Sequence, residues 1–188
     1  MSEQRRTFAV AFVCTGNRFR SPLAAALFSA ATEALPVRVS SVGTLELGPV
    51  PALPEAVELA RTLQVDLASH RASCLGRVDL EPFDLVLGFE RMHVREAVVD
   101  GAARIERTFT LPELVGLLEA LPASASPPDP LERAAERIAR AHASRPPQSW
   151  TAAIPEIGDP LARPAREQQK TAEQVDALVR RVVQLLFD

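Results

Sequence analysis

A loop at residues 14–21 constrains this chain more than any other segment, because it holds Cys14 and Arg20 with five residues between them. Residues 8–13 form an unbroken apolar run, which predicts a buried strand leading into the loop. Residues 22–31 are rich in alanine and leucine and begin with proline, whose missing N–H costs nothing in a first helical turn. The pattern therefore predicts a strand, a tight loop and a helix, with the loop at the helix N-terminus.

The residues of this loop indicate a site for a tetrahedral oxyanion. Unpaired N–H groups at a helix N-terminus surround an anion when a tight turn ends there, and the same field stabilises a thiolate at Cys14. Arg20 keeps its charge, and its planar fork matches two oxygens of a phosphoryl group. Ser21 can donate a hydrogen bond to the departing sulfur, while Gly16 and Asn17 tolerate unusual backbone angles. We predict a nucleophilic cysteine in a phosphate-binding loop.

Length and apolar content predict one soluble domain. The 188 residues are 47% apolar, enough for a sizeable core, and no stretch approaches the ~20 apolar residues that cross a bilayer. The N-terminus precedes only six apolar residues and lacks a small-residue cleavage site, which favours a strand over a signal peptide and a cytoplasmic location.

Charge and cysteine content exclude several classes of site. The 21 basic and 24 acidic residues are spread evenly and leave a net charge of −3, which argues against a nucleic-acid partner. Two cysteines far apart in the sequence predict neither a disulfide framework nor a metal cluster.

Strand and helix signals alternate along the chain. Further strands are predicted at 37–42, 84–89 and 104–109, and helices at 54–63, 90–99, 110–121 and 166–187. Thr110 and Glu113 resemble a capping box that opens the third of these helices. This alternation predicts an α/β fold: a single-domain, doubly wound, four-stranded parallel sheet with helices on both faces, of the flavodoxin-like type. Ligands bind at the carboxyl ends of such strands, where Cys14 stands.

Residues 122–150 differ in composition from the rest of the predicted domain, which spans 1–188. A Pro/Ala-rich linker comes first and predicts a break. A short helix is expected after it, with Leu131, Ala135, Ile138 and His142 on one face. We interpret the segment as an insert.

The sequence resembles the low-molecular-weight protein tyrosine phosphatase family over nearly its whole length apart from the insert. Four motifs occur in the family's order and spacing: residues 13–22 as the phosphate loop, 40–44 at the end of the second strand, 69–72 around a histidine, and 157–160 as the Asp-Pro loop. The resemblance implies the phosphotyrosine phosphatase I type of fold. It also implies a metal-independent, cofactor-free hydrolase acting on a phosphorylated protein, foremost on phosphotyrosine, or on a small phosphomonoester.

The resemblance also implies roles for individual residues. Cys14 would attack phosphorus and form a phosphocysteine intermediate, Asp159 would protonate the leaving group and then activate water, and Arg20 would hold the phosphoryl oxygens. Ser41 and His70 would support the loop by binding the Asn17 side chain. The other members of the phosphate-binding loop would be Thr15, Gly16, Asn17, Arg18, Phe19 and Ser21.

Three positions depart from the family pattern. Phe19 replaces a cysteine that protects the nucleophile in many relatives. Arg18 stands where an aliphatic wall residue is usual, and it either attracts substrates with additional negative charge or points into water. Leu161 follows the Asp-Pro pair in place of an aromatic residue, and the chain has no tyrosine, so Phe19, Trp150 or Phe89 would have to supply an aromatic wall.

Alternative interpretations remain open at this stage. Cys14 could be a buried apolar residue and Asp159 an ordinary turn residue, as in a non-catalytic phosphate-binding module. Arsenate reduction on the same fold would need a relay of thiols, for which only Cys74 is available. We expect His93 and His142 to be packed or solvated rather than catalytic.

Overall fold

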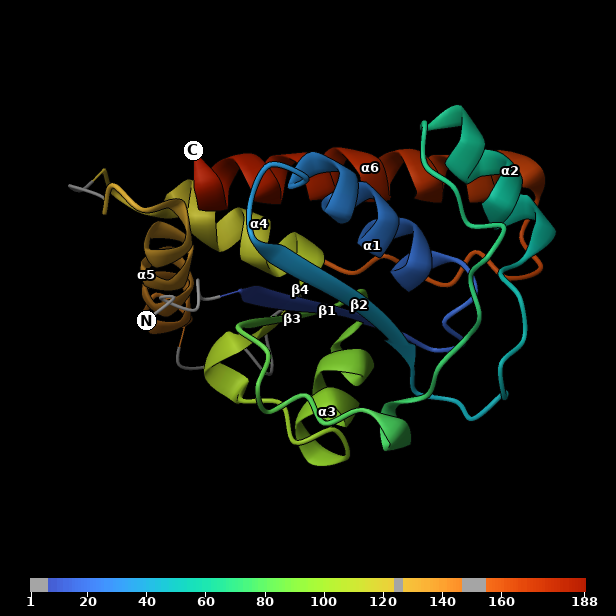
Figure 1. Ribbon diagram of the computed structural model, residues 1–188, viewed down its shortest axis with the longest axis horizontal. Coiled ribbons are helices and arrows are strands. Elements are labelled where there is room, and N and C mark those ends of the chain that lie inside the picture. Colours follow the sequence, from blue (N-terminus) through green and yellow to red (C-terminus); the bar gives the residue numbers. More distant parts are fainter. Residues whose placement is uncertain (1–6, 124–126, 147–154) are drawn as a thin grey trace, which may run out of the picture.

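Four strands form one parallel sheet in the order β2-β1-β3-β4 in the computed structural model, which describes residues 7–123, 127–146 and 155–188. Their bounds are β1 Phe8–Cys14, β2 Val37–Gly43, β3 Leu85–Gly88 and β4 Thr108–Thr110. The helices are α1 Arg20–Ala31, α2 Pro54–Thr62, α3 Arg91–Val99, α4 Leu111–Ala120, α5 Pro130–Ala143 and α6 Ala165–Phe187. Helices α1 and α6 cover one face of the sheet and α3 covers the other (Figure 1). The predicted α/β fold is confirmed.

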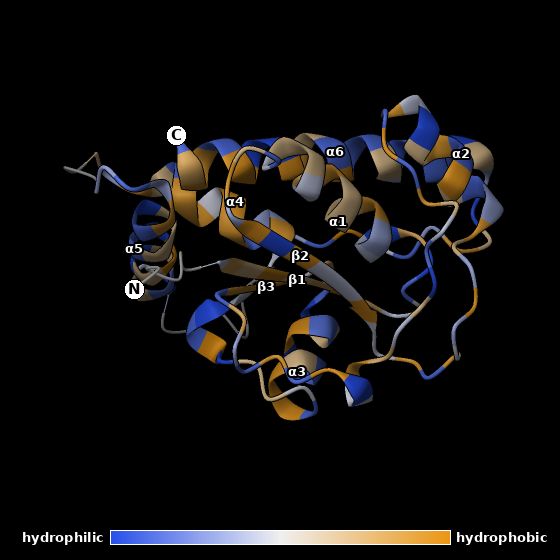
Figure 2. Ribbon diagram, viewed as in Figure 1, coloured by the Kyte–Doolittle hydropathy of each residue, from blue (hydrophilic) through white to orange (hydrophobic). Residues whose placement is uncertain are grey.

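Central position in the sheet explains the apolar run of β1. All seven of its residues are buried, because β2 and β3 pair with its two edges and helices cover both of its faces. Phe8, Val10 and Phe12 face the larger core under α1 and α6, while Ala9 and Ala11 face the smaller core under α3. Figure 2 shows β1 in the colours of apolar residues, whereas β2 carries hydrophilic residues along part of its length.

Helix α6 closes the larger core with a stripe at helical spacing. Val175, Val179, Val182 and Leu186 are fully buried, and each such side chain contributes about 1.5–3 kcal/mol of burial free energy. The Phe187 ring packs edge-on against that of Phe8, with 5.8 Å between centroids. None of the described helices is long and apolar enough to cross a membrane.

Two element predictions need correction. Residues 104–107 were predicted as strand, but Ile105–Arg107 form a short 3-10 helix and only Thr108–Thr110 pair with β3. The Arg107 N–H donates to the Arg104 carbonyl at 2.9 Å, so this residue is in the turn and not in the ladder. The helix predicted in the insert is α5, with 14 residues. Its buried face carries Ala134 and Ala141, together with Leu131 and Ile138, rather than Ala135 and His142.

The strand order determines where a ligand can bind. The chain passes from β1 to β2 on one side and later enters β3 on the other side of β1. The loops after β1 and β3 therefore diverge from neighbouring strand ends, which leaves a crevice at the carboxyl edge of the sheet. Cys14 ends β1 at this edge, and Glu90 follows β3 there.

Candidate active site

The loop after Cys14 turns its backbone N–H groups inward. Its carbonyl oxygens bind the segment after β2, with Thr44 N–H donating to Cys14 O and Leu53 N–H donating to Arg18 O, each at 2.9 Å. In a planar trans peptide unit the C=O and the N–H group point in opposite directions. Since these carbonyl oxygens point outward, the N–H groups of the residues that follow them point inward. Within this loop and the start of α1, the N–H groups that have no acceptor among the described residues are those of Thr15, Gly16, Arg18, Phe19, Arg20 and Ser21. These N–H groups form a cup, and an arrangement of this kind can hold an oxyanion.

The Cys14 sulfur lies at the bottom of this cup. It receives the Asn17 N–H at 3.3 Å and lies 3.0 Å from the Ser21 hydroxyl oxygen. The Ser21 oxygen accepts a hydrogen bond from Asn17 Nδ2 at 2.8 Å, and its own proton can go to the sulfur or to the Val42 carbonyl, which lies 3.4 Å away. Cys14 is 3% exposed, yet it lines the pocket described below. Cys14 thus has two hydrogen-bond partners within the loop.

Asn17 connects the loop to two neighbouring segments. It adopts a left-handed conformation, with φ 52°, as expected for an asparagine in such a turn. Its Nδ2 also donates to Ser41 Oγ at 2.9 Å, and its Oδ1 accepts the N–H of Ser73 at 2.9 Å. His70 binds the backbone carbonyl of Asn17, at 2.7 Å, and not the side chain as the resemblance implied. Ser73 was not predicted, because a backbone donor carries no sequence signature.

His70 is held in its neutral form. Burial lowers the pKa of His70, the Arg71 charge lowers it further, and the hydrogen bond to Asn17 opposes both effects in part. Because a carbonyl accepts only from a donor, Nε2 carries the proton of the neutral ring. His70 therefore supports the loop without adding a charge.

Two glycines lie at the loop, and the structure gives a reason for only one of them to be glycine. Gly16 has no positive φ, so the unusual backbone angle expected there is absent. Gly43 is required for a different reason: a Cβ at this position would lie 2.9 Å from Thr15 O and 3.0 Å from Asn17 N. The end of β2 must lack a side chain because the loop lies directly against it.

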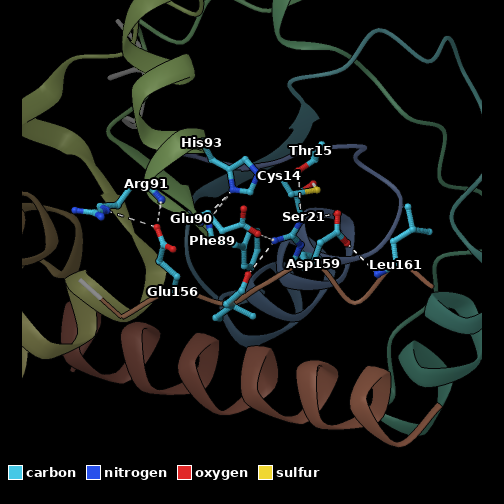
Figure 3. Close-up of polar contacts among 12 residues, drawn as sticks. Cys14, Thr15, Ser21, Phe89, Glu90, Arg91, His93, Glu156, Asp159 and Leu161 are labelled. Carbon is cyan, nitrogen blue, oxygen red and sulfur yellow. Dashed lines mark hydrogen bonds and ion pairs between the residues drawn. The ribbon is translucent and has the colours of Figure 1, made fainter. Parts of the chain in front are cut away.

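Arg20 forms ion pairs with Glu90 and Asp159, two residues that Figure 3 shows at the site. It is 1% exposed, and its NH1 group binds the Glu90 carboxylate and the Ile157 carbonyl, the latter at 2.9 Å. Its NH2 group lies 3.0 Å from Asp159 Oδ2 and 3.4 Å from Thr15 Oγ1. The structure thus brings Cys14, Arg20 and Asp159 together, as the sequence predicted. Glu90 was missed, although a carboxylate directly after the strand next to β1 is a signal that could have revealed it.

His93 was expected to be packed or solvated, and it is fully buried, with hydrogen-bond partners that the sequence did not suggest. Its Nδ1 accepts the N–H of Glu90 at 3.1 Å, so Nε2 carries the proton and donates to Thr15 Oγ1 at 3.0 Å. Burial and the nearby Arg20 charge lower the pKa of His93 to about 4. The neutral ring orients the Thr15 hydroxyl, which keeps its own proton for a phosphoryl oxygen.

The Asp159 loop is attached to the end of β3. Ile157 N–H donates to Phe89 O at 2.9 Å, and Glu156 Oε1 accepts the N–H of Arg91 at 2.7 Å. Asp159 Oδ1 accepts the N–H of Leu161 at 3.0 Å, which sets the direction of the carboxylate. The Asp159 side chain remains 43% exposed, so it can exchange protons with solvent.

A pocket of about 300 Å³ opens above the sulfur. Its lining is largely aliphatic, from Leu45, Leu47, Leu53 and Leu161, with Phe19, Arg18 and the catalytic candidates completing it. Phe89 is fully buried and packs against Phe12, so it supplies no wall to the pocket, and Trp150 lies outside the described residues.

The remaining candidates lie away from the sulfur. Cys74 is buried, and its thiol donates to Glu46 Oε2 at 2.6 Å. His142 is half-buried on α5, where its Nδ1 lies 3.4 Å from NH1 of Arg145. Neither residue lines the pocket.

Comparison with known proteins agrees with this geometry. The profile of the family described as low molecular weight phosphotyrosine protein phosphatase matches residues 9–144. The protein-arginine-phosphatase of Bacillus subtilis (strain 168) is 37% identical over 108 residues, which are 56% of this chain and 71% of that protein. The probable low molecular weight protein-tyrosine-phosphatase EpsP of Ralstonia solanacearum is 36% identical over 103 residues, 54% of this chain and 69% of that one.

Solved structures show the same similarity over a longer span. The low molecular weight protein tyrosine phosphatase of T. tengcongensis superimposes with a TM-score of 0.69 at 28% identity, over 95% of this chain and 99% of that one. A YwlE mutant from Bacillus subtilis superimposes with a TM-score of 0.70 at 25% identity, over 97% of this chain and 100% of that one. The profile match, the curated relatives and these structures together show that this chain belongs to the low molecular weight phosphotyrosine protein phosphatase family.

Proposed function

We propose that Cys14, Arg20 and Asp159 carry out the catalysis of this phosphatase through a phosphocysteine intermediate. One observation carries the proposal: the sulfur, the guanidinium and the carboxylate all line one pocket, with Arg20 NH2 only 3.0 Å from Asp159 Oδ2. The inward N–H groups of the loop supply the oxyanion donors that such a reaction needs.

In the first step, the Cys14 thiolate attacks phosphorus, an S–P bond forms and the P–O bond to the leaving group breaks. Asp159 gives its proton to the departing oxygen. A phosphoryl group that binds Arg20 NH2 takes the donor that Asp159 now occupies. Two anions in contact repel, so an arriving dianionic phosphoryl group favours the protonated carboxyl that this step requires.

In the second step, the Asp159 carboxylate takes a proton from water, whose oxygen bonds to phosphorus as the S–P bond breaks. Cys14 leaves as a thiolate, stabilised by the Ser21 hydroxyl and the N–H of Asn17. Arg20 and the loop amides hold the phosphoryl oxygens throughout, and Thr15 adds one hydroxyl donor.

Phosphotyrosine in proteins is the substrate that we propose first. A pocket with aliphatic walls and a volume of about 300 Å³ suits a flat apolar leaving group. Phosphoarginine is the second candidate, because a relative is named a protein-arginine-phosphatase. It is also favoured because the described rim offers no aromatic ring for stacking: Leu161 follows the Asp-Pro pair and Phe19 is only 4% exposed.

The test is hydrolysis of an aryl phosphate at mildly acidic pH by the wild type and two variants. We expect no activity from Cys14→Ser, and from Asp159→Ala a kcat lower by about 10²–10⁴, the usual contribution of general acid catalysis. Asp66→Ala is the matched control, because Asp66 Oδ1 accepts the N–H of Ala68 at 2.8 Å in the same kind of turn but on an exposed surface. Full activity of the serine variant would exclude the mechanism.

Parallel assays decide the substrate. Phosphotyrosine and phosphoarginine in peptides of otherwise identical sequence are compared by kcat/KM. An arsenate assay tests the alternative reductase, for which Cys74 is engaged with Glu46 rather than facing the pocket.

A further inference from the structure

Arg18 brings a second guanidinium to the phosphate pocket. Its Nε donates to the carbonyl of Pro51 at 2.9 Å, and its own backbone carbonyl accepts the N–H of Leu53 at 2.9 Å. Both contacts go to the segment between β2 and α2, which contributes Leu45, Leu47 and Leu53 to the wall of the pocket. The Nε contact anchors the Arg18 side chain to this segment. An anchored guanidinium loses less freedom when it binds a ligand than a mobile one does.

The outer part of this guanidinium is not neutralised. Arg18 forms no ion pair, and its two terminal NH2 groups have no acceptor, among the residues that the structure describes. The pocket's carboxylate, Asp159, is bound to Arg20 instead. Four N–H donors of Arg18 therefore remain available, in the fork geometry that matches a carboxylate or a phosphate.

The surroundings of Arg18 strengthen its field. Leu45, Leu47 and Leu161 line the same pocket and are 51%, 43% and 60% exposed, so the rim is apolar as well as open. A charge beside apolar groups is screened less than one surrounded by water. The scissile phosphoryl group is met by the loop amides and Arg20, whereas the Arg18 side chain turns toward Pro51. It can therefore reach a part of the substrate beyond the scissile phosphate.

We propose that Arg18 is a specificity-determining residue that selects phosphorylated substrates with a second anionic group beside the scissile phosphate. This inference rests on the proposed function. The second anion is a carboxylate or a phosphate, supplied by an acidic residue next to the phosphorylated residue in a protein, or by a small molecule that carries both groups. The bound anion accepts two hydrogen bonds from the free NH2 groups, and the Nε contact with Pro51 persists.

The test compares charged and neutral substrates within each variant. Small substrates are 3-carboxyphenyl phosphate and phenyl phosphate, and peptide substrates carry glutamate or glutamine beside the phosphorylated residue. For the wild type we expect kcat/KM to be about 5- to 20-fold higher for the charged member, the range for a charge-assisted contact that water still reaches. The ratio of kcat/KM for the charged member to kcat/KM for the neutral member falls to near one in Arg18→Met, which keeps the apolar stem of the side chain. The same ratio is intermediate in Arg18→Lys.

Two controls keep the outcome clear. Arg61→Met removes an exposed arginine of α2 whose partner is Glu58, and it leaves the ratio at the wild-type value. In the wild type, the preference weakens from low to high salt, a measurement that does not depend on the folding of any variant. A preference in the peptide arm alone identifies the flanking acidic residue as the source, and one in the small-molecule arm alone identifies the small dianionic ester.

Failures of the two proposals are distinguishable. If the wild type hydrolyses neither phenyl phosphate nor the peptides that carry phosphotyrosine or phosphoarginine, the proposed function fails. If it hydrolyses both members of each pair equally, or if Arg18→Met keeps the wild-type ratio, the function stands and the role of Arg18 is refuted.

Discussion

Replacing Glu90 with glutamine tests whether the buried ion pair with Arg20 organises the active site. The Arg20 side chain is 2% exposed and that of Glu90 is 19% exposed, so the pair lies away from bulk water. Glutamine keeps an acceptor oxygen of the same reach but removes the negative charge. Arg20 then keeps only one carboxylate, that of Asp159 at 3.0 Å.

The structure sets the size of the expected effect. Removing one partner of a buried ion pair costs about 3–5 kcal/mol, and the retained acceptor and Asp159 offset part of this. We therefore expect a loss of about 2 kcal/mol in the free energy of unfolding, which lowers the Tm by about 4–8 °C in a chain of this size. Arg20 also shifts toward Asp159, and a misplacement of about 1 Å lowers kcat/KM by about 10²-fold.

Thermal unfolding and aryl phosphate kinetics measure the two effects. Glu58→Gln is the control, because Glu58 pairs with Arg61 on α2 with both side chains more than half exposed, and such pairs contribute little. A double-mutant cycle with Asp159→Ala should be non-additive, since both carboxylates bind one guanidinium. Wild-type Tm and wild-type kcat/KM in Glu90→Gln would refute the reasoning.

Two further predictions follow from the packing around the loop. Gly43→Ala forces a Cβ to within 2.9 Å of Thr15 O and should lower the free energy of unfolding by about 1–3 kcal/mol in urea titrations. Gly116→Ala, at an exposed position of α4 with open space around it, should raise that free energy, and equal effects would contradict the packing argument. Since the pKa of His93 is about 4 in the folded protein against 6.5 in the unfolded chain, unfolding takes up a proton between these values, and stability falls as the pH falls from 6.5 to 4. His93→Asn keeps an acceptor for the Glu90 N–H and should reduce the loss in free energy of unfolding between pH 6.5 and 4 by about 3 kcal/mol. An unchanged pH dependence would be evidence against a neutral, buried His93.

Local signals were sufficient for most of the architecture. The unbroken apolar run of β1 and the capping box of Thr110 and Glu113 were recognised correctly, because each depends on neighbours in the chain. The start of β4 was misplaced, since a 3-10 turn at Ile105–Arg107 takes the Arg107 N–H to the Arg104 carbonyl and out of the ladder. The buried face of α5 was shifted for a different reason: it is selected by contacts with distant elements.

The active site, like the fold, could be predicted from the sequence only where the contacts are local. The sequence alone determined the phosphate loop, because Cys14, Asn17 and Arg20 lie within one turn whose geometry follows from local chemistry. Only the tertiary structure decided that Glu90 would hold Arg20, that His93 would orient Thr15, and that the Ile157 carbonyl would reach the guanidinium. These contacts join residues about 70 or more positions apart, and they exist because parallel strands end at a common edge of the sheet.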